Sequence, residues 1–142
     1  MNLEEKLQYY RKRKKIVPSR NMIKTAAQIE GIRKAGQING QVLDAVDQII
    51  KPGISTEEIN RVVHETTIRL GGTPATLGFE GYPKSVCTSV NDVICHGIPS
   101  EDQILMEGDI INVDATTIVD GYYGDASRMY CIGQVSEQAE KL

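Results

Sequence analysis

The chain has 142 residues, 40% hydrophobic and 25% charged, with a net charge of −3, which is typical of a globular domain and excludes a fibrous or wholly disordered protein. It contains no apolar stretch long enough to cross a bilayer and no apolar segment of a secretory signal in its first twenty residues, so we expect no membrane contact. Three cysteines, an odd number, argue against a disulfide framework and predict a reducing, cytoplasmic environment.

The N-terminal segment differs in charge from the rest of the chain. Residues 1–20 carry seven basic and two acidic side chains, whereas residues 21–142 carry nine basic and seventeen acidic ones. The run Arg11–Lys15 is a candidate contact for a polyanion such as ribosomal RNA, because Lys and Arg neutralise phosphates. The alternative is a solvated tail or helix face. We therefore divide the chain into a basic extension, residues 1–20, and an acidic body, residues 21–142.

The first helix of the body is predicted to begin at a capping box formed by Thr25 and Gln28. Apolar residues then recur at intervals of three and four, as on one face of a helix, until Lys51-Pro52-Gly53 ends the pattern. The residues of this apolar face are Ile29, Ile32, Ala35, Val42, Leu43, Val46, Ile49 and Ile50.

A second helix is predicted from the capping box of Ser55 and Glu58 to Gly71-Gly72. Its apolar positions are Ile59, Val62, Val63, Thr66 and Leu70. His64 lies in this helix, but a zinc-protease helix needs a second histidine at the position of Ile68, so we expect His64 to be an exposed surface residue. The two helices are expected to be antiparallel and to need a sheet that covers their apolar faces.

A first hairpin is predicted around the turn Asn91-Asp92, which is flanked by β-branched residues. A two-residue turn there places Cys87 directly opposite His96, with Cβ atoms about 5 Å apart on the same face. Cys95 then lies on the other face. A neighbouring histidine and cysteine can be a metal-ligand pair, a nucleophile with its base, or part of a pocket wall, and a histidine on a strand can equally be structural.

A second hairpin is predicted around Asp120-Gly121, with strands from about residue 109 to 118 and from 122 to 132. Asp125 then faces Thr116, and Asp114 is its diagonal neighbour on the same face. Two carboxylates this close repel each other unless a proton or a cation lies between them. The pair is therefore a candidate metal site, acid–base dyad or glycosidase pair, unless Asp125 lies in an exposed loop.

The order helix, helix, hairpin, hairpin predicts an α+β fold with an antiparallel sheet and helices on one of its faces. A short helix is expected to begin at Ser136.

Three stretches of the chain together resemble the motifs of type I methionine aminopeptidases. They are GYPKSVCTSVNDVICHGIP at residues 81–99, GDIINVD at 108–114 and DGYYGD at 120–125. The resemblance extends from Ile23 to Gly133 and includes the connector KPGIST at 51–56. It implies the pita-bread (creatinase/aminopeptidase) fold and removal of the initiator methionine from nascent polypeptides by a centre of two divalent metal ions, which can be cobalt, manganese, iron or zinc.

The resemblance also implies roles for individual residues. Asp114 and Asp125 match two metal ligands, with Asp125 bridging the ions, and His96 matches a catalytic histidine that contacts the scissile amide of the substrate. Further residues match positions that line the pocket for the methionine side chain: Phe79, Tyr82 and Cys87, with Thr76 nearby where some members have a cysteine. A mostly apolar pocket with a sulfur atom suits a thioether.

The family's fold has two similar halves, and this chain corresponds to the first. The second half is expected to supply one histidine and two glutamate ligands and a further histidine at the substrate. Because each ion needs four to six ligands, we expect a truncated chain that is inactive by itself. The alternatives are a non-catalytic pita-bread homologue that binds a protein or ribosomal RNA partner, and a ribosome-docking module that uses Arg11–Lys15.

Overall fold

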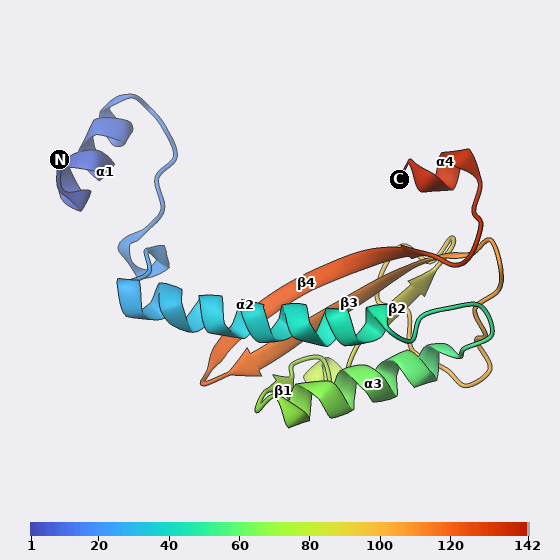
Figure 1. The fold of residues 1–142 in the computed structure, drawn as a ribbon. Coiled ribbons are helices and arrows are strands. Elements are labelled where there is room, and N and C mark those ends of the chain that lie inside the picture. Colours follow the sequence, from blue (N-terminus) through green and yellow to red (C-terminus); the bar gives the residue numbers. More distant parts are fainter. Residues whose placement is uncertain (142) are drawn as a thin grey trace.

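The computed structural model describes residues 1–141 and has an α+β architecture (Figure 1). A four-stranded antiparallel sheet lies behind two long helices that cover one of its faces, as predicted. The elements are α1 (Leu3–Lys12), α2 (Ala26–Asp47), α3 (Thr56–Arg69), β1 (Thr73–Pro74), β2 (Cys87–Val90), β3 (Ile110–Val119), β4 (Tyr122–Cys131) and α4 (Glu137–Glu140), with 3-10 turns at Arg20–Met22 and Phe79–Gly81.

The helices begin where the capping signals predicted, but α2 ends at Asp47, so Ile49 and Ile50 lie beyond the helix to which the apolar pattern assigned them. At the start of α2 the Thr25 hydroxyl accepts from the Gln28 amide at 3.2 Å, and the Gln28 side chain accepts from the Thr25 amide at 2.9 Å, so this capping box is confirmed. At α3 only half of the box forms, because Ser55 caps the Glu58 amide while the Glu58 carboxylate pairs with Arg61. Helix α4 begins after Ser136, as predicted.

The hydrophobic core lies between the two helices and one face of β3. Alternate residues of β3 are buried against α2 and α3, and they are Ile111, Val113, Ala115, Thr117 and Val119. A buried polar contact fixes α2 on the strand: the Asn39 side chain donates to the Ala115 carbonyl at 2.9 Å and accepts from the Thr117 hydroxyl at 2.8 Å. Both groups of the amide are therefore satisfied inside the core.

The apolar face of α2 is shorter than predicted. Ile29 and Ile32 remain 47% and 39% exposed, and the buried face begins at Ala35. There the backbone of Gly124 lies so close that a Cβ on it would be 2.4 Å from the Ala35 carbonyl oxygen. The sheet turns back just beyond this contact, at Asp120, whose carboxylate pairs with Lys34 at 2.7 Å. The first turns of α2 thus extend past the strands that would cover them (Figure 1).

The two predicted hairpins have opposite outcomes. The hairpin at Asp120-Gly121 is confirmed in its register, with Thr116 opposite Asp125 and Val119 opposite Tyr122. The prediction of a hairpin at Asn91-Asp92 is wrong. Strand β2 pairs with β3, which places Cys87 opposite Asp114, and residues 91–98 form no strand.

The cause of this difference lies at Asn91. Its backbone φ is +52°, and its amide side chain accepts from the Ile110 N–H at 3.1 Å and donates to the Asp109 carboxylate at 2.8 Å. The end of β2 is thereby tied to the beginning of β3, about twenty residues later in the chain. The following residues leave the sheet and return to β2 only at Gly97, whose carbonyl accepts from the Thr88 N–H at 2.8 Å.

The N-terminal helix α1 stands apart from the sheet at the end of the molecule where α2 begins (Figure 1). An Asn2–Glu5 capping box starts it, and an ion pair between Glu4 and Arg20 links it to the segment before α2. The division at residue 20 stays a prediction. Within residues 1–141, no helix combines the length and the apolar character needed to cross a membrane.

Candidate functional site

A pocket of about 700 Å³ opens on the face of the sheet that the helices leave uncovered. It brings together every site residue expected from the sequence: Thr76, Phe79, Tyr82, Cys87, His96, Asp114 and Asp125. Three of its further lining residues were not predicted, namely Ile98, Thr116 and Tyr123. Thr116 and Tyr123 follow from the hairpin register, because they lie next to Asp125 on the two strands.

The two aspartates meet at the centre of β3 and β4. Asp125 stands opposite Thr116, whose hydroxyl donates to its carboxylate at 2.9 Å, and Asp114 is two residues from Thr116 on the same face. Burial raises the pKa of Asp114, the negative charge of Asp125 raises it further, and His96 lowers it. The site therefore disfavours two ionised carboxylates, and a cation between them would remove that penalty.

The donors of this pair fit a divalent metal ion only in part. Carboxylate oxygens are suitable ligands for manganese, cobalt, iron or zinc. Among residues 1–141, however, no group of three or more histidine, cysteine, aspartate and glutamate side chains is close enough to hold an ion. The described residues thus provide two of the four to six ligands that such an ion needs.

Cys87 forms a neutral part of the pocket wall. It is 5% exposed and lies opposite Asp114 in the sheet. Burial raises the pKa of its thiol, as do the charges of Asp114 and Cys95, while a hydrogen bond with Tyr82 lowers it. The thiol is therefore protonated at neutral pH, which suits an apolar wall and argues against the nucleophile–base pair considered from the sequence.

His96 reaches this pocket by a route that the sequence did not predict. The expected strand pairing with Cys87 is absent, and His96 instead lies in the loop after β2, with a backbone φ of +56°. The chain returns to β2 one residue later, where the Thr88 N–H donates to the Gly97 carbonyl at 2.8 Å. His96 and Cys87 are therefore in one pocket although their predicted register is wrong.

His64 is not the exposed residue that we expected from the sequence. It is half-buried, with its Nδ1 atom 2.8 Å from the Ser85 hydroxyl, because the segment leading into β2 passes over this side of α3. Asn60 accepts from the Ser85 N–H at 2.8 Å, and Glu57 pairs with Lys84 at 2.7 Å. Three side chains on successive turns of α3 thus bind the segment that leads into β2.

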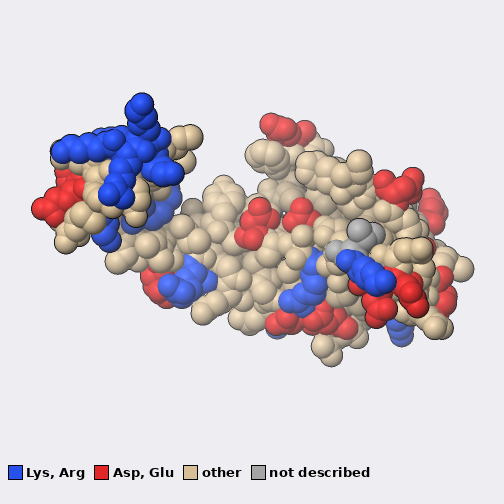
Figure 2. Space-filling view, turned by 90° about the horizontal axis from the view of Figure 1, so that it is seen from above, with Lys and Arg blue, Asp and Glu red and all other residues tan. Residues whose placement is uncertain are grey.

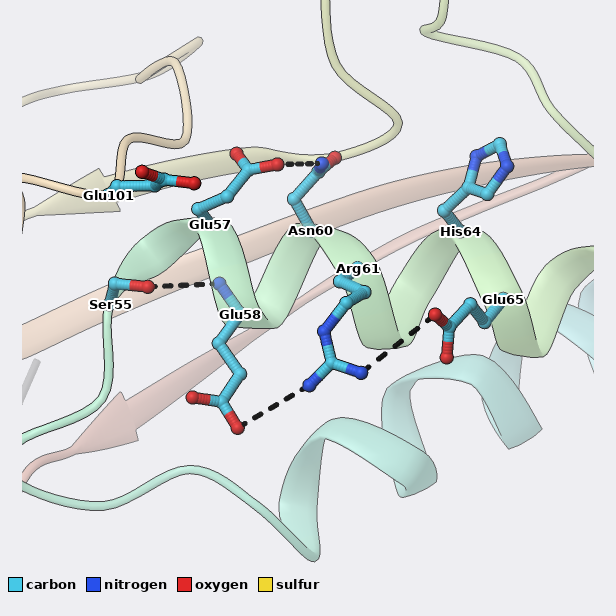
Figure 3. A pocket seen from close by; sticks show the side chains of 8 residues that line it. All are labelled: Ser55, Glu57, Glu58, Asn60, Arg61, His64, Glu65 and Glu101. Atoms are coloured by element: carbon cyan, nitrogen blue, oxygen red, sulfur yellow. Dashed lines mark hydrogen bonds and ion pairs between the residues drawn. The ribbon is translucent and has the colours of Figure 1, made fainter.

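These three side chains point to the same side of α3 and border a second pocket of about 570 Å³ (Figure 3). The remaining acidic residues of the helix face are paired, since Arg61 lies between Glu58 and Glu65. This pocket is therefore a polar groove with largely compensated charges, and we assign no chemistry to it.

Comparison with known proteins agrees with the fold. The sequence model of metallopeptidase family M24 matches residues 30–142. The chain belongs to this family. It is 46% identical over 121 residues to a methionine aminopeptidase of Buchnera aphidicola, and 50% identical over 115 residues to methionine aminopeptidase A of Synechocystis. These matches cover 85% and 81% of the chain but 46% of each relative, so the chain spans less than half of their length.

Solved structures show the same relationship. The methionine aminopeptidases of Rickettsia prowazekii and Thermotoga maritima both superpose with a TM-score of 0.82, at 42% and 36% identity, and each match covers 84% of this chain and 48% of the other. A Xaa-Pro dipeptidase from Bacillus anthracis shares the fold with a TM-score of 0.72. The pita-bread prediction is confirmed, and membership of a metallopeptidase family implies dependence on a divalent metal.

Proposed function

We propose that the pocket is the part of a methionine aminopeptidase site that this chain supplies, and that it serves to remove the initiator methionine from nascent polypeptides. The observation that carries the proposal is the pair Asp114 and Asp125, which face one cavity from neighbouring strands. The relatives described above are named as methionine aminopeptidases, which supports the same activity.

The metal would be held by Asp114 and Asp125, as part of a centre of two divalent ions. When bound, such ions polarise a carbonyl group and make water a stronger acid, which is the chemistry that peptide hydrolysis needs. The Thr116 hydroxyl orients Asp125 by donating to one of its oxygens, and this leaves the other oxygen free of that bond. The same oxygen donors accept cobalt, manganese, iron or zinc, so availability decides which is used.

The substrate would enter with its N-terminal methionine side chain against Phe79, Tyr82, Cys87 and Thr76. The protonated thiol and the two aromatic rings provide a soft, mostly uncharged surface for a thioether. His96 lies at the same pocket and can donate a hydrogen bond to the substrate amide, where negative charge develops during attack.

The function can be tested by release of methionine from a Met-Ala-Ser peptide in the presence of cobalt or manganese. We expect little or no release by the 142-residue polypeptide alone, because two carboxylates hold two ions weakly. We expect release when it is mixed with the second half of the Synechocystis relative, and none when the mixture contains the Asp114→Asn variant. Clear turnover by the polypeptide alone, or no turnover by an associated mixture, would contradict the proposal.

The basic extension supports a second proposal, a contact with ribosomal RNA. Figure 2 shows the basic side chains gathered on the N-terminal part of the molecule, whereas acidic side chains are spread over the body. Within this extension, Arg13 lies 4.2 Å from the centre of the Tyr9 ring, and the run Arg11–Lys15 is exposed. Binding to ribosomes should weaken steeply with salt and be lost on deletion of residues 1–20. Binding that is insensitive to salt would contradict this contact.

The non-catalytic alternative is less well supported. A homologue that only binds a partner does not need its metal ligands, yet Asp114, Asp125 and His96 are all present in one pocket.

A further inference from the structure

The loop that carries His96 lies outside the sheet, and its own side chains do little to hold it. Val93, Ile94 and Cys95 are all exposed, Ile94 to 95%. In the part of the chain that the structure describes, the His96 side chain makes no hydrogen bond. Whatever fixes His96 at the pocket must therefore act on the ends of the loop.

The first end is anchored by Asn91, which bonds to Asp109 and Ile110 as described above. The second end is anchored by Gly97, the residue directly after His96. The Gly97 carbonyl accepts from the Thr88 N–H at 2.8 Å and from the Tyr82 hydroxyl at 2.9 Å. The Gly97 N–H donates to the Ser89 hydroxyl at 3.2 Å. Both polar groups of this one residue are thus held by β2 and by Tyr82.

The contact between Gly97 and β2 leaves no room for a side chain. A Cβ on Gly97 would lie 2.0 Å from the Thr88 carbonyl oxygen, a backbone atom that cannot move aside easily. The adjoining His96 has a backbone φ of +56°, in the left-handed region that a residue with a Cβ rarely occupies. Such a conformation persists only where the surroundings impose it. The anchored Gly97 peptide is the surrounding structure that does so here.

We propose that Tyr82 is a positioning residue: its hydroxyl, together with that of Ser89, fixes the Gly97 peptide against β2 and so holds His96 at the pocket. The hydroxyl oxygen is also 3.1 Å from the Val86 carbonyl oxygen, so its single proton is shared between two carbonyl groups, one at the beginning of β2 and one at the end of the loop. Burial raises the pKa of Tyr82 well above its ordinary value, and the hydroxyl keeps its proton for these bonds. Tyr82 thus has a role beyond lining the pocket with its ring.

The catalytic importance of placing His96 at the pocket rests on the function proposed above. The claim that Tyr82 and Ser89 fix His96 there does not rest on it. Tyr82→Phe keeps the aromatic ring in the pocket and removes only the hydroxyl, so it separates the two roles. Ser89→Ala tests the other bond to Gly97 without changing the pocket wall. Tyr122→Phe is the matched control, because within residues 1–141 the Tyr122 hydroxyl makes no hydrogen bond and Tyr122 does not line the pocket.

The experiment is NMR on the metal-free, full 142-residue chain, with amide hydrogen exchange at Thr88 and Gly97 and the three-bond HN–Hα coupling of His96 as readouts. Loss of one hydrogen bond from the Gly97 carbonyl should speed exchange at Thr88 by about three- to tenfold in Tyr82→Phe. The His96 coupling should move toward the value of a conformationally averaged residue. Amides of β3 and β4 should exchange as in the wild type, since the effect is local.

Two results would overturn the proposal. One is an exchange rate at Thr88 and a His96 coupling in Tyr82→Phe that match those of Tyr122→Phe. The other is a rise in exchange that is equal throughout β3 and β4, which would mean a general loss of stability. If Tyr82→Phe does not fold, Ser89→Ala tests the proposal instead. The proposal then requires faster amide exchange at Gly97 and a shifted His96 coupling in Ser89→Ala, and unchanged values would overturn it. If the predicted NMR changes appear but the associated mixture with the second half of the Synechocystis relative releases no methionine, only the proposed function is contradicted.

Discussion

The two faces of β3 are built from alternate residues of one strand and have different tasks. The face toward α2 and α3 consists of buried residues such as Ile111 and Val113, whose side chains form the core. The opposite face carries Asn112, Asp114 and Thr116, which are only half-buried, and Asp114 and Thr116 border the pocket. Under the proposed function, neighbouring positions on one strand serve stability and metal binding separately, and substitutions at adjacent residues should separate the two properties.

The largest effect is expected on the covered face. Ile111→Ala should lower the free energy of unfolding by about 2–5 kcal/mol, because it leaves a cavity in a core that cannot close completely. Ile118→Ala, on the half-exposed face of the same strand, should lower it by about 1 kcal/mol or less. Urea unfolding of both variants measures the difference. Equal losses would show that the two faces are not distinct.

The next effect depends on metal. Manganese at about one hundred times its dissociation constant should stabilise the wild-type chain by about 2.7 kcal/mol, through binding to the folded state alone. Asp114→Asn should lose most of this gain. Without metal, the same variant should be more stable than the wild type at neutral pH, because a raised pKa means that folding disfavours the ionised Asp114.

The control for this experiment is Asp120→Asn, at the exposed turn of the same hairpin. It should keep the stabilisation by manganese. Thermal unfolding with and without manganese compares the three proteins, and equal gains in all of them would contradict a site at Asp114.

A smaller effect is expected from a polar group that breaks the pattern of the covered face. Thr88 lies opposite Val113 and is 1% exposed, and its hydroxyl has no hydrogen-bond partner within residues 1–141. Thr88→Val should raise the free energy of unfolding by roughly 1 kcal/mol, since it removes an unsatisfied buried hydroxyl at nearly constant shape. Chemical denaturation measures the gain, and a clear loss of stability would show that the hydroxyl has a partner in solution.

The smallest effect concerns the rim of the covered face, where Asp47 accepts from Tyr130 at 2.7 Å and pairs with Arg128. The hydrogen bond from Tyr130, and then Arg128, hold the pKa of Asp47 below its ordinary value of 3.8, against the effect of burial. This contribution to stability is complete above that value and is lost as the pH falls through the lowered pKa. Asp47→Asn should therefore flatten the stability profile below about pH 4. An unchanged acid profile in urea unfolding would contradict this.

The contrast between the two hairpins shows how much of the fold the sequence could predict. The Asp120-Gly121 turn fixes the register of adjacent strands, so the positions of Asp114 and Asp125 could be derived from local signals. Asn91-Asp92 resembles the same hairpin turn signal. The Asn91 side chain, however, forms hydrogen bonds with residues about twenty positions later in the chain, and no local sequence pattern reveals such partners.

The same limit explains what was missed at the site. The pocket residues were named from motifs, and the structure brings them together, although the predicted pairing of Cys87 with His96 is wrong. The contact of His64 with Ser85 and the bond from Tyr82 to Gly97 both join segments that are distant in the chain. Periodicity and capping signals describe single helices and strands, so they cannot predict contacts between segments that are distant in the chain.

We propose that Asp114 and Asp125 jointly hold a divalent cation, and calorimetric titration of the metal-free chain with manganese is the decisive measurement. We expect Asp114→Asn and Asp125→Asn each to weaken manganese binding by at least about tenfold, and Asp120→Asn to leave it unchanged. Unaltered affinity in either site variant would mean that the two carboxylates do not share an ion, and the peptidase assignment of this pocket would have to be abandoned.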